Sequence, residues 1–137
     1  MALTPVSAAQ LIFDISEVNE ISTGSNICDL EIYDNVLFSL DMQFGLETYD
    51  ISNLTDPEFL GVCIDSYNYG HALVLDELRS LAYVADYEDG LEIVNISIPS
   101  QLPIISSYMN DTNQLTWPGS TDLDFMDNIV YLVVLLC

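Results

Sequence analysis

The sequence predicts an all-β fold built from a repeated unit of four antiparallel strands. Three observations indicate this class. A unit of about 45 residues recurs along the chain, each full copy holds four short apolar runs, and turn residues separate those runs. No stretch with helical periodicity and capping residues competes with them.

The repeat is clearest around two glycines. Residues 90–97 read Gly-Leu-Glu-Ile-Val-Asn-Ile-Ser, residues 45–52 read Gly-Leu-Glu-Thr-Tyr-Asp-Ile-Ser, and five of the eight positions are identical. Residues 11–16, Leu-Ile-Phe-Asp-Ile-Ser, repeat the end of the same unit. The runs at 36–40, 81–85 and 129–133 also match, each with an aromatic residue in third place: Phe38, Tyr83 and Tyr131.

In the second full copy the expected strands are 71–75, 81–85, 90–96 and 103–109. Four strands per 40 to 50 residues is the spacing of a β-propeller blade. The predicted layout is a partial blade at 1–26, blades at 27–69 and 70–120, and a partial blade at 121–137. Because an open arc leaves apolar faces uncovered, we expect a fragment of a longer propeller. The alternative is a ring closed by several copies of the chain.

The second copy resembles a known repeat. Ala82-Tyr83-Val84-Ala85-Asp86, then residues 89–97, then a loop ending at Pro103 are similar to the LVIVD repeat. Asn95 stands where that family usually has Asp, and the first copy departs further, with Thr48 in an aliphatic position. The resemblance implies a β-propeller, mostly from secreted or surface proteins of bacteria and archaea. It implies no particular chemistry, because propellers host many functions.

The charge balance limits the partners. The chain has 22 acidic residues and one basic residue, Arg79, which gives a formal net charge of −21. Such a surface repels nucleic acid and anionic membranes, whose binding depends on Lys and Arg. It favours divalent cations, basic partners or a high-salt setting, and the alternative is a solvated face that serves solubility.

Targeting and redox signals are few. Residues 1–16 are not expected to form a signal peptide. The nine apolar residues at 129–137 are too few for a membrane-spanning helix, so a buried strand is expected there. Cys28, Cys63 and Cys137 allow at most one disulfide and match no zinc motif. The family resemblance favours an extracellular or cell-surface location, and the location itself is left open.

The acidic turn Asp86, Glu88 and Asp89 before Gly90 is a candidate calcium site, because calcium takes several oxygen ligands. The alternative is a solvated turn, since the matching turn at 41–45 does not keep these acids. Four further residues are predicted to be structural. Gly45 and Gly90 suit a turn with positive φ, and Asp50 and Asn95 suit Asx-turns that begin the following loop.

The only histidine, His71, opens the first strand of its repeat, and the alignment places Asp29 and Asp122 at the matching position. First strands line the central channel of a propeller, so these three side chains are predicted to lie at the channel mouth. Carboxylates near a histidine can bind a cation. The alternative is a solvated polar rim.

Three functions remain open from the sequence. The preferred one is a non-enzymatic scaffold or binding module for a protein or carbohydrate partner, because no catalytic triad or nucleophile motif is present. The second is a propeller enzyme or divalent-cation site at the channel. The third is a fragment without activity of its own.

Overall fold

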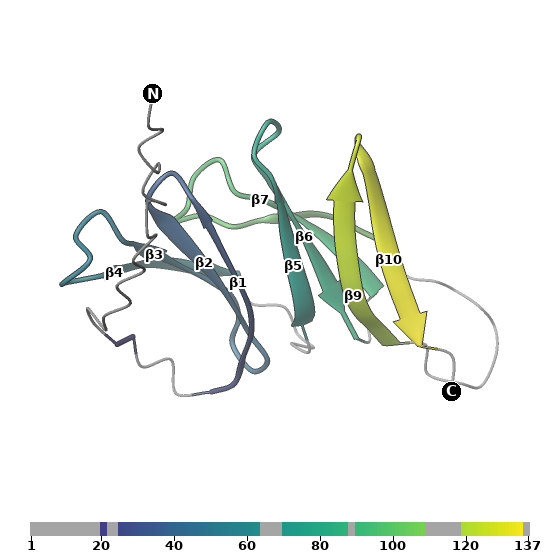
Figure 1. The fold of residues 1–137 in the computed structure, drawn as a ribbon, viewed down its shortest axis with the longest axis horizontal. Helices are drawn as coiled ribbons and strands as arrows, with labels where there is room; N and C mark the ends of the chain where they lie inside the picture. The colour runs from purple at the N-terminus through teal and green to yellow at the C-terminus, as the bar shows by residue number, and fades with distance from the viewer. Residues whose placement is uncertain (1–19, 22–24, 64–69, 88–89, 109–118, 136–137) are drawn as a thin grey trace, which may run out of the picture.

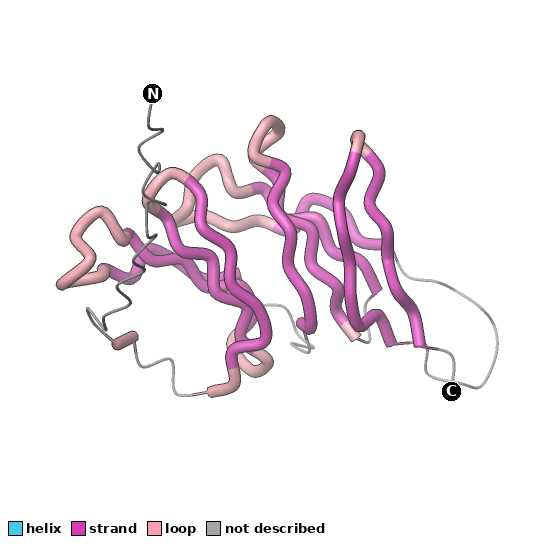
Figure 2. Tube along the Cα trace, in the orientation of Figure 1, coloured by secondary structure: helices cyan, strands magenta, loops and turns pink. Residues whose placement is uncertain are grey.

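The computed structural model describes residues 20–21, 25–63, 70–87, 90–108 and 119–135. These residues form ten strands in three antiparallel sheets that stand side by side (Figure 1), and Figure 2 shows only strands and loops in them. No helix among them is long and apolar enough to cross a membrane. The strands are β1 Ile27–Tyr33, β2 Val36–Asp41, β3 Gly45–Asp50, β4 Glu58–Cys63, β5 Gly70–Asp76, β6 Leu81–Asp86, β7 Gly90–Asn95, β8 Ile104–Tyr108, β9 Gly119–Met126 and β10 Ile129–Leu135.

Two sheets have four strands each, in the order of the chain. We call β1–β4 the first blade, β5–β8 the second blade and the two-stranded sheet β9–β10 the half-blade. The first strands β1, β5 and β9 lie next to one another along the inner side of the arc (Figure 1). The predicted all-β fold of four-stranded antiparallel blades is thus confirmed, and the described sheets do not close into a ring.

Tight turns join the first and second strands. Asp34 and Asn35 both have positive φ, at 48° and 61°, and Asp127 and Asn128 repeat this at 51° and 67°. Two successive residues with positive φ define the turn that matches the right-handed twist of a hairpin, and Asp and Asn tolerate that conformation. Equivalent hairpins thus begin the first blade and the half-blade.

Glycine and Asx residues hold the remaining connections. Gly45 and Gly90 start the third strands with φ of 86° and 79°, a region that favours glycine. At the other end of those strands, Asp50 Oδ1 accepts a hydrogen bond from Ser52 N at 2.8 Å, and Asn95 Oδ1 accepts one from Ser97 N at 2.9 Å. Hydrogen bonds from Ser52 also lower the pKa of Asp50 below its usual value.

The core lies between the sheets. Phe38 and Leu40 of β2 pack with Val84 of β6 and Val94 of β7, where the first blade meets the second. Tyr83 is buried in a second cluster, where the second blade meets the half-blade. The Tyr83 ring stacks on Phe125 of β9, with 5.4 Å between ring centroids. Packing between neighbouring blades therefore supplies the core, as in other repeat proteins.

Candidate site at the inner-strand rim

One end of the arc gathers the acidic candidates. The first strands begin there, at Ile27, Gly70 and Gly119, and the second strands end there, at Asp41 and Asp86. We call this end the rim. It holds Asp29 on β1, His71 on β5 and Asp122 on β9, three strands that follow one another along the arc, and their place at a channel mouth stays a prediction.

The prediction that Asp29, His71 and Asp122 hold the same position in their strands is wrong for His71, which lies one residue before that position. Asp29 lies opposite Leu40 and Asp122 lies opposite Val133, and in the second blade Ala72 takes that place, opposite Ala85. Each first strand has a register shift just before this position, at Ile27/Asp29 in β1 and Gly70/Ala72 in β5. A β-bulge adds one unpaired residue, and His71 is that residue, as Cys28 is in β1.

Asp29 uses its carboxylate to join two blades. Its Oδ1 accepts a hydrogen bond from Leu30 N at 2.9 Å, and its Oδ2 accepts one from Leu73 N of β5 at 2.8 Å. Asp122 accepts the local bond from Leu123 N at 2.9 Å, no bond to it from another described blade is found, and its side chain is exposed. Of the two aspartates, Asp122 is therefore the one that faces solvent, while Asp29 braces the first blade against the second.

His71 lies against an aromatic ring. Its ring centroid is 5.7 Å from that of Tyr87, which follows β6. Tyr87 also covers Gly119, where an added Cβ would come within 1.9 Å of the tyrosine ring. A side chain at position 119 would therefore have to displace the Tyr87 ring. His71, Tyr87 and Gly119 connect the rim of the second blade to that of the half-blade.

Cys28 sits in a negative environment. Burial raises the pKa of its thiol, and the charges of Asp41 and Asp29 raise it further. Because the thiolate is the reactive form, these neighbours make Cys28 a poor nucleophile at neutral pH. Neither Cys28 nor Cys63 forms a disulfide with another residue that the structure describes.

Asp41 is fully buried at the end of β2. Its Oδ1 accepts hydrogen bonds from Gln43 N at 2.7 Å and Phe44 N at 2.9 Å, which closes the turn before β3. Its Oδ2 is buried and has no hydrogen-bond partner among the residues that the structure describes. A buried carboxylate oxygen without a partner is costly, and Asp41 Oδ2 is the one such side-chain atom among the described residues.

The expected calcium turn is only partly placed. Asp86 is 3% exposed at the end of β6, and Glu88 and Asp89 lie outside the described residues. Across the described ranges, no group of three or more His, Cys, Asp or Glu side chains is arranged to hold a metal ion. Calcium binding at residues 86–89 stays a prediction.

Two features near the rim escaped the sequence analysis. Ser120 Oγ lies 2.5 Å from Asp86 O and 2.6 Å from Gly90 O, which ties the half-blade to the second blade. Asp86 and Glu92 also line a cavity of about 20 Å³ between the first two blades, beside the buried Cys63. That volume accommodates about one water molecule. An isolated serine or glutamate carries no sequence signal for such a position.

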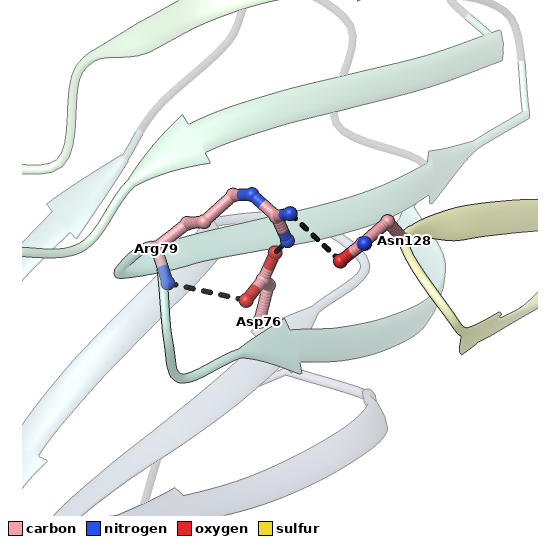
Figure 3. A network of polar contacts seen from close by, with 3 residues as sticks. All are labelled: Asp76, Arg79 and Asn128. Carbon is pink, nitrogen blue, oxygen red and sulfur yellow. Dashed lines mark hydrogen bonds and ion pairs between the residues drawn. The ribbon is translucent and has the colours of Figure 1, made fainter.

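The single basic residue lies at the opposite end of the arc. Arg79 Nη1 donates to Asp76 Oδ2 at 2.6 Å, Arg79 N donates to Asp76 Oδ1 at 3.1 Å, and Arg79 Nη2 donates to Asn128 Oδ1 at 2.7 Å (Figure 3). Burial by itself raises the pKa of Asp76, but the hydrogen bonds and charge of Arg79 outweigh burial and lower it. Arg79 therefore joins the second blade to the half-blade away from the rim.

We expect Arg79→Gln to lower the melting temperature by several degrees at pH 7. A lowered folded-state pKa means that ionised Asp76 stabilises the fold above its unfolded pKa of about 3.9, and that this stability is lost as the pH falls through the folded value. The difference between variant and parent should thus shrink below about pH 4. Thermal melts from pH 2 to 8 measure it.

Asn53→Asp serves as the control for Arg79→Gln. It makes the same change in net charge, in an exposed loop where the aspartate can keep the bonds that Asn53 Oδ1 accepts from Thr55. Equal loss of stability in both variants, at every pH, would show that only the net charge matters.

The comparisons with known proteins agree with this architecture. Residues 81–110 match the family model of the LVIVD repeat. A search of curated proteins and a search of solved structures find no match to the chain. The matched residues span β6, β7 and β8 and include the loop that contacts the first blade. The chain therefore carries an LVIVD repeat at residues 81–110, in the second blade of its arc.

Proposed function

We propose that the chain is a non-enzymatic propeller scaffold whose rim binds a basic segment of a partner protein. The observation that carries the proposal is the placement of Asp29 on β1 and Asp122 on β9, the inner strands on either side of β5, at one end of the arc. The chain has a net charge of −21, and its one basic residue lies at the other end. Complementary charge steers such encounters and selects the partner.

The experiment is a titration of the whole chain with a labelled oligolysine peptide, followed by fluorescence anisotropy. Asp122→Asn should weaken binding about two- to fivefold, as expected for one exposed charge pair. Asp127→Asn is the matched control, because Asp127 is also exposed and lies at the opposite end of the same hairpin. Equal weakening by both variants, or none by Asp122→Asn, would contradict a binding site at the rim.

A divalent-cation site at the rim is the second candidate. The buried Asp41 Oδ2, which lacks a partner among the described residues, favours it, and Asp29 lies nearby. Calorimetric titration with calcium tests this alternative. Heat that disappears in Asp41→Asn and persists in Asp127→Asn would support it, while the absence of heat and of any shift in melting temperature would rule it out.

An extracellular location stays a prediction of the family resemblance.

A further inference from the structure

The half-blade exposes positions that are buried in the first two blades. Tyr131 and Val133 of β10 take the places that Phe38 and Leu40 have in β2. Phe38 and Leu40 are each 1% exposed because the second blade covers them, whereas Tyr131 is 49% and Val133 51% exposed. This face of the half-blade therefore has the composition of a blade–blade contact and has no blade against it among the described residues.

The first blade, which lies on the far side of the second blade from the half-blade, shows the complementary exposure. Leu30 of β1 takes the place that Leu73 has in β5. Leu73 is 4% exposed in the contact between the first two blades, while Leu30 is 54% exposed. Ile32, two residues later on the same face, is 61% exposed. The first blade thus exposes the face that, in the second blade, packs against the preceding blade. The half-blade exposes the face that, in the first blade, packs against the following blade.

The outer edge of β10 also has no partner among the described strands. Strands β2 and β6 each pair on both sides, with a first and a third strand, but β10 pairs only with β9 in the described part of the chain. An unpaired edge offers a row of backbone donors and acceptors to an added strand. The missing element is a third strand.

The sequence contains a third-strand segment outside the described sheets. Residues 11–16 repeat the pattern of residues 47–52 and 92–97, with Asp14 in the place of Asp50 and Asn95. In this alignment Phe13 takes the place of Val94 and Ile12 that of Ile93. Since Val94 pairs with Ala82 and Ile93 pairs with Tyr83, the matching partners on β10 are Val130 and Tyr131.

We propose that residues 9–16 of a second copy of this chain pair antiparallel with β10 and complete the half-blade, and that two copies exchange this segment. Phe13 then lies opposite Val130, and Ile12 lies opposite Tyr131. The exposed Tyr131 and Val133 of each copy cover Leu30 and Ile32 of the other. The contact is made twice around a two-fold axis, as in a symmetric dimer with exchanged strands.

The arrangement of the arc selects a second copy. The exposed faces and the β10 edge belong to the first blade and to the half-blade, and within one chain the second blade separates these two sheets (Figure 1). A second copy brings a first-blade face and a segment 9–16 to the half-blade together, and its own half-blade meets the first copy in the same way.

The first test is the mass of the whole chain, by size-exclusion chromatography with light scattering over a dilution series. We expect twice the mass of one 15.3 kDa chain. Ile12→Pro and Phe13→Asp should raise the dimer dissociation constant roughly a hundredfold or more, because proline removes a strand donor and aspartate places a charge in the contact. Ser7→Pro, before the pairing segment, should leave the dimer intact. These substitutions lie outside the described sheets, so folding can be checked separately by circular dichroism.

A mixing experiment separates exchange from pairing within one chain. Phe13→Asp impairs the segment and Tyr131→Asp impairs the β10 edge, so each variant alone should be monomeric. Mixed, they should form a heterodimer, because the intact segment of one meets the intact β10 of the other. A monomeric parent chain, an oligomer other than a dimer, a dimer insensitive to Ile12→Pro, or a mixture that stays monomeric would each overturn the proposal.

Discussion

Phe38→Ala is expected to lower the free energy of unfolding by about 3–5 kcal/mol, the usual cost of deleting a fully buried aromatic ring. Phe38 is 1% exposed and is the largest of the fully buried side chains among the described residues. Its ring lies in the cluster with Leu40, Val84 and Val94, so the cavity opens between the first two blades. Because small domains are stable by only about 5–15 kcal/mol, the variant should be close to unfolding.

Urea denaturation at a fixed protein concentration measures this effect, since any association of the chain makes stability depend on concentration. Phe44→Ala is the matched control. Phe44 is 41% exposed in the turn before β3, and the bond to Asp41 uses its backbone nitrogen, which the substitution keeps. We expect a loss of less than about 1 kcal/mol. Similar losses for the two variants would contradict a core formed between the blades.

The strand pattern was accessible from the sequence because local chemistry determines it. The expected strands at 71–75, 81–85, 90–96 and 103–109 correspond to β5, β6, β7 and β8. Alternating apolar residues and a glycine able to adopt positive φ are properties of the segment itself. The inward position of Phe38 and Tyr83 follows from the same alternation. Tyr131 follows the same alternation but is 49% exposed, because burial also requires a neighbouring blade.

The rim could be predicted only in part. Aligning His71 with Asp29 and Asp122 matched the aspartates at the first turns, but Asp76 still pairs with Leu81 inside the strand, whereas Asp34 and Asp127 lie in the turns. The turn at 77–80 is longer than those at 34–35 and 127–128, and the sequence does not show on which side of the strand end the aspartate lies. Asp86 was expected in a solvated or cation-binding turn, yet it is 3% exposed, because burial of an acid depends on contacts that the local sequence does not encode.

Thr48 shows how an apparent defect in the repeat has a tertiary cause. It occupies a position where the repeat has an aliphatic residue, Ile93 in the second blade. Thr48 is fully buried, and its Oγ1 lies 2.6 Å from Pro99 O of the second blade and 3.2 Å from Gly61 O of the adjacent strand. The hydroxyl therefore satisfies a carbonyl in the contact between the blades, which an aliphatic side chain would leave without a partner.

Gly61→Ala is expected to lower the free energy of unfolding by about 1–3 kcal/mol, and Gly61→Val by more, because both overfill this contact. A Cβ on Gly61 would lie 3.0 Å from Pro99 O and from the Cα and carbonyl carbon of Ser100. These are backbone atoms of the loop between β7 and β8, so they cannot turn aside as a flexible side chain does. The blades must move apart, and the bond from Thr48 to Pro99 lengthens with them.

Ser106→Val is the matched control for Gly61→Val. Ser106 pairs with Ile93 as Gly61 pairs with Thr48, so the two residues hold the same place in β8 and β4. Ser106 is exposed, so valine there should change stability by no more than about 0.5 kcal/mol. Both variants place valine in a fourth strand, so a large loss confined to Gly61 isolates the contact with Pro99. An equal loss of unfolding free energy at both positions would mean that valine disturbs the fourth strand itself. The loop at 99–100 would then contribute little to the stability of the contact between the blades.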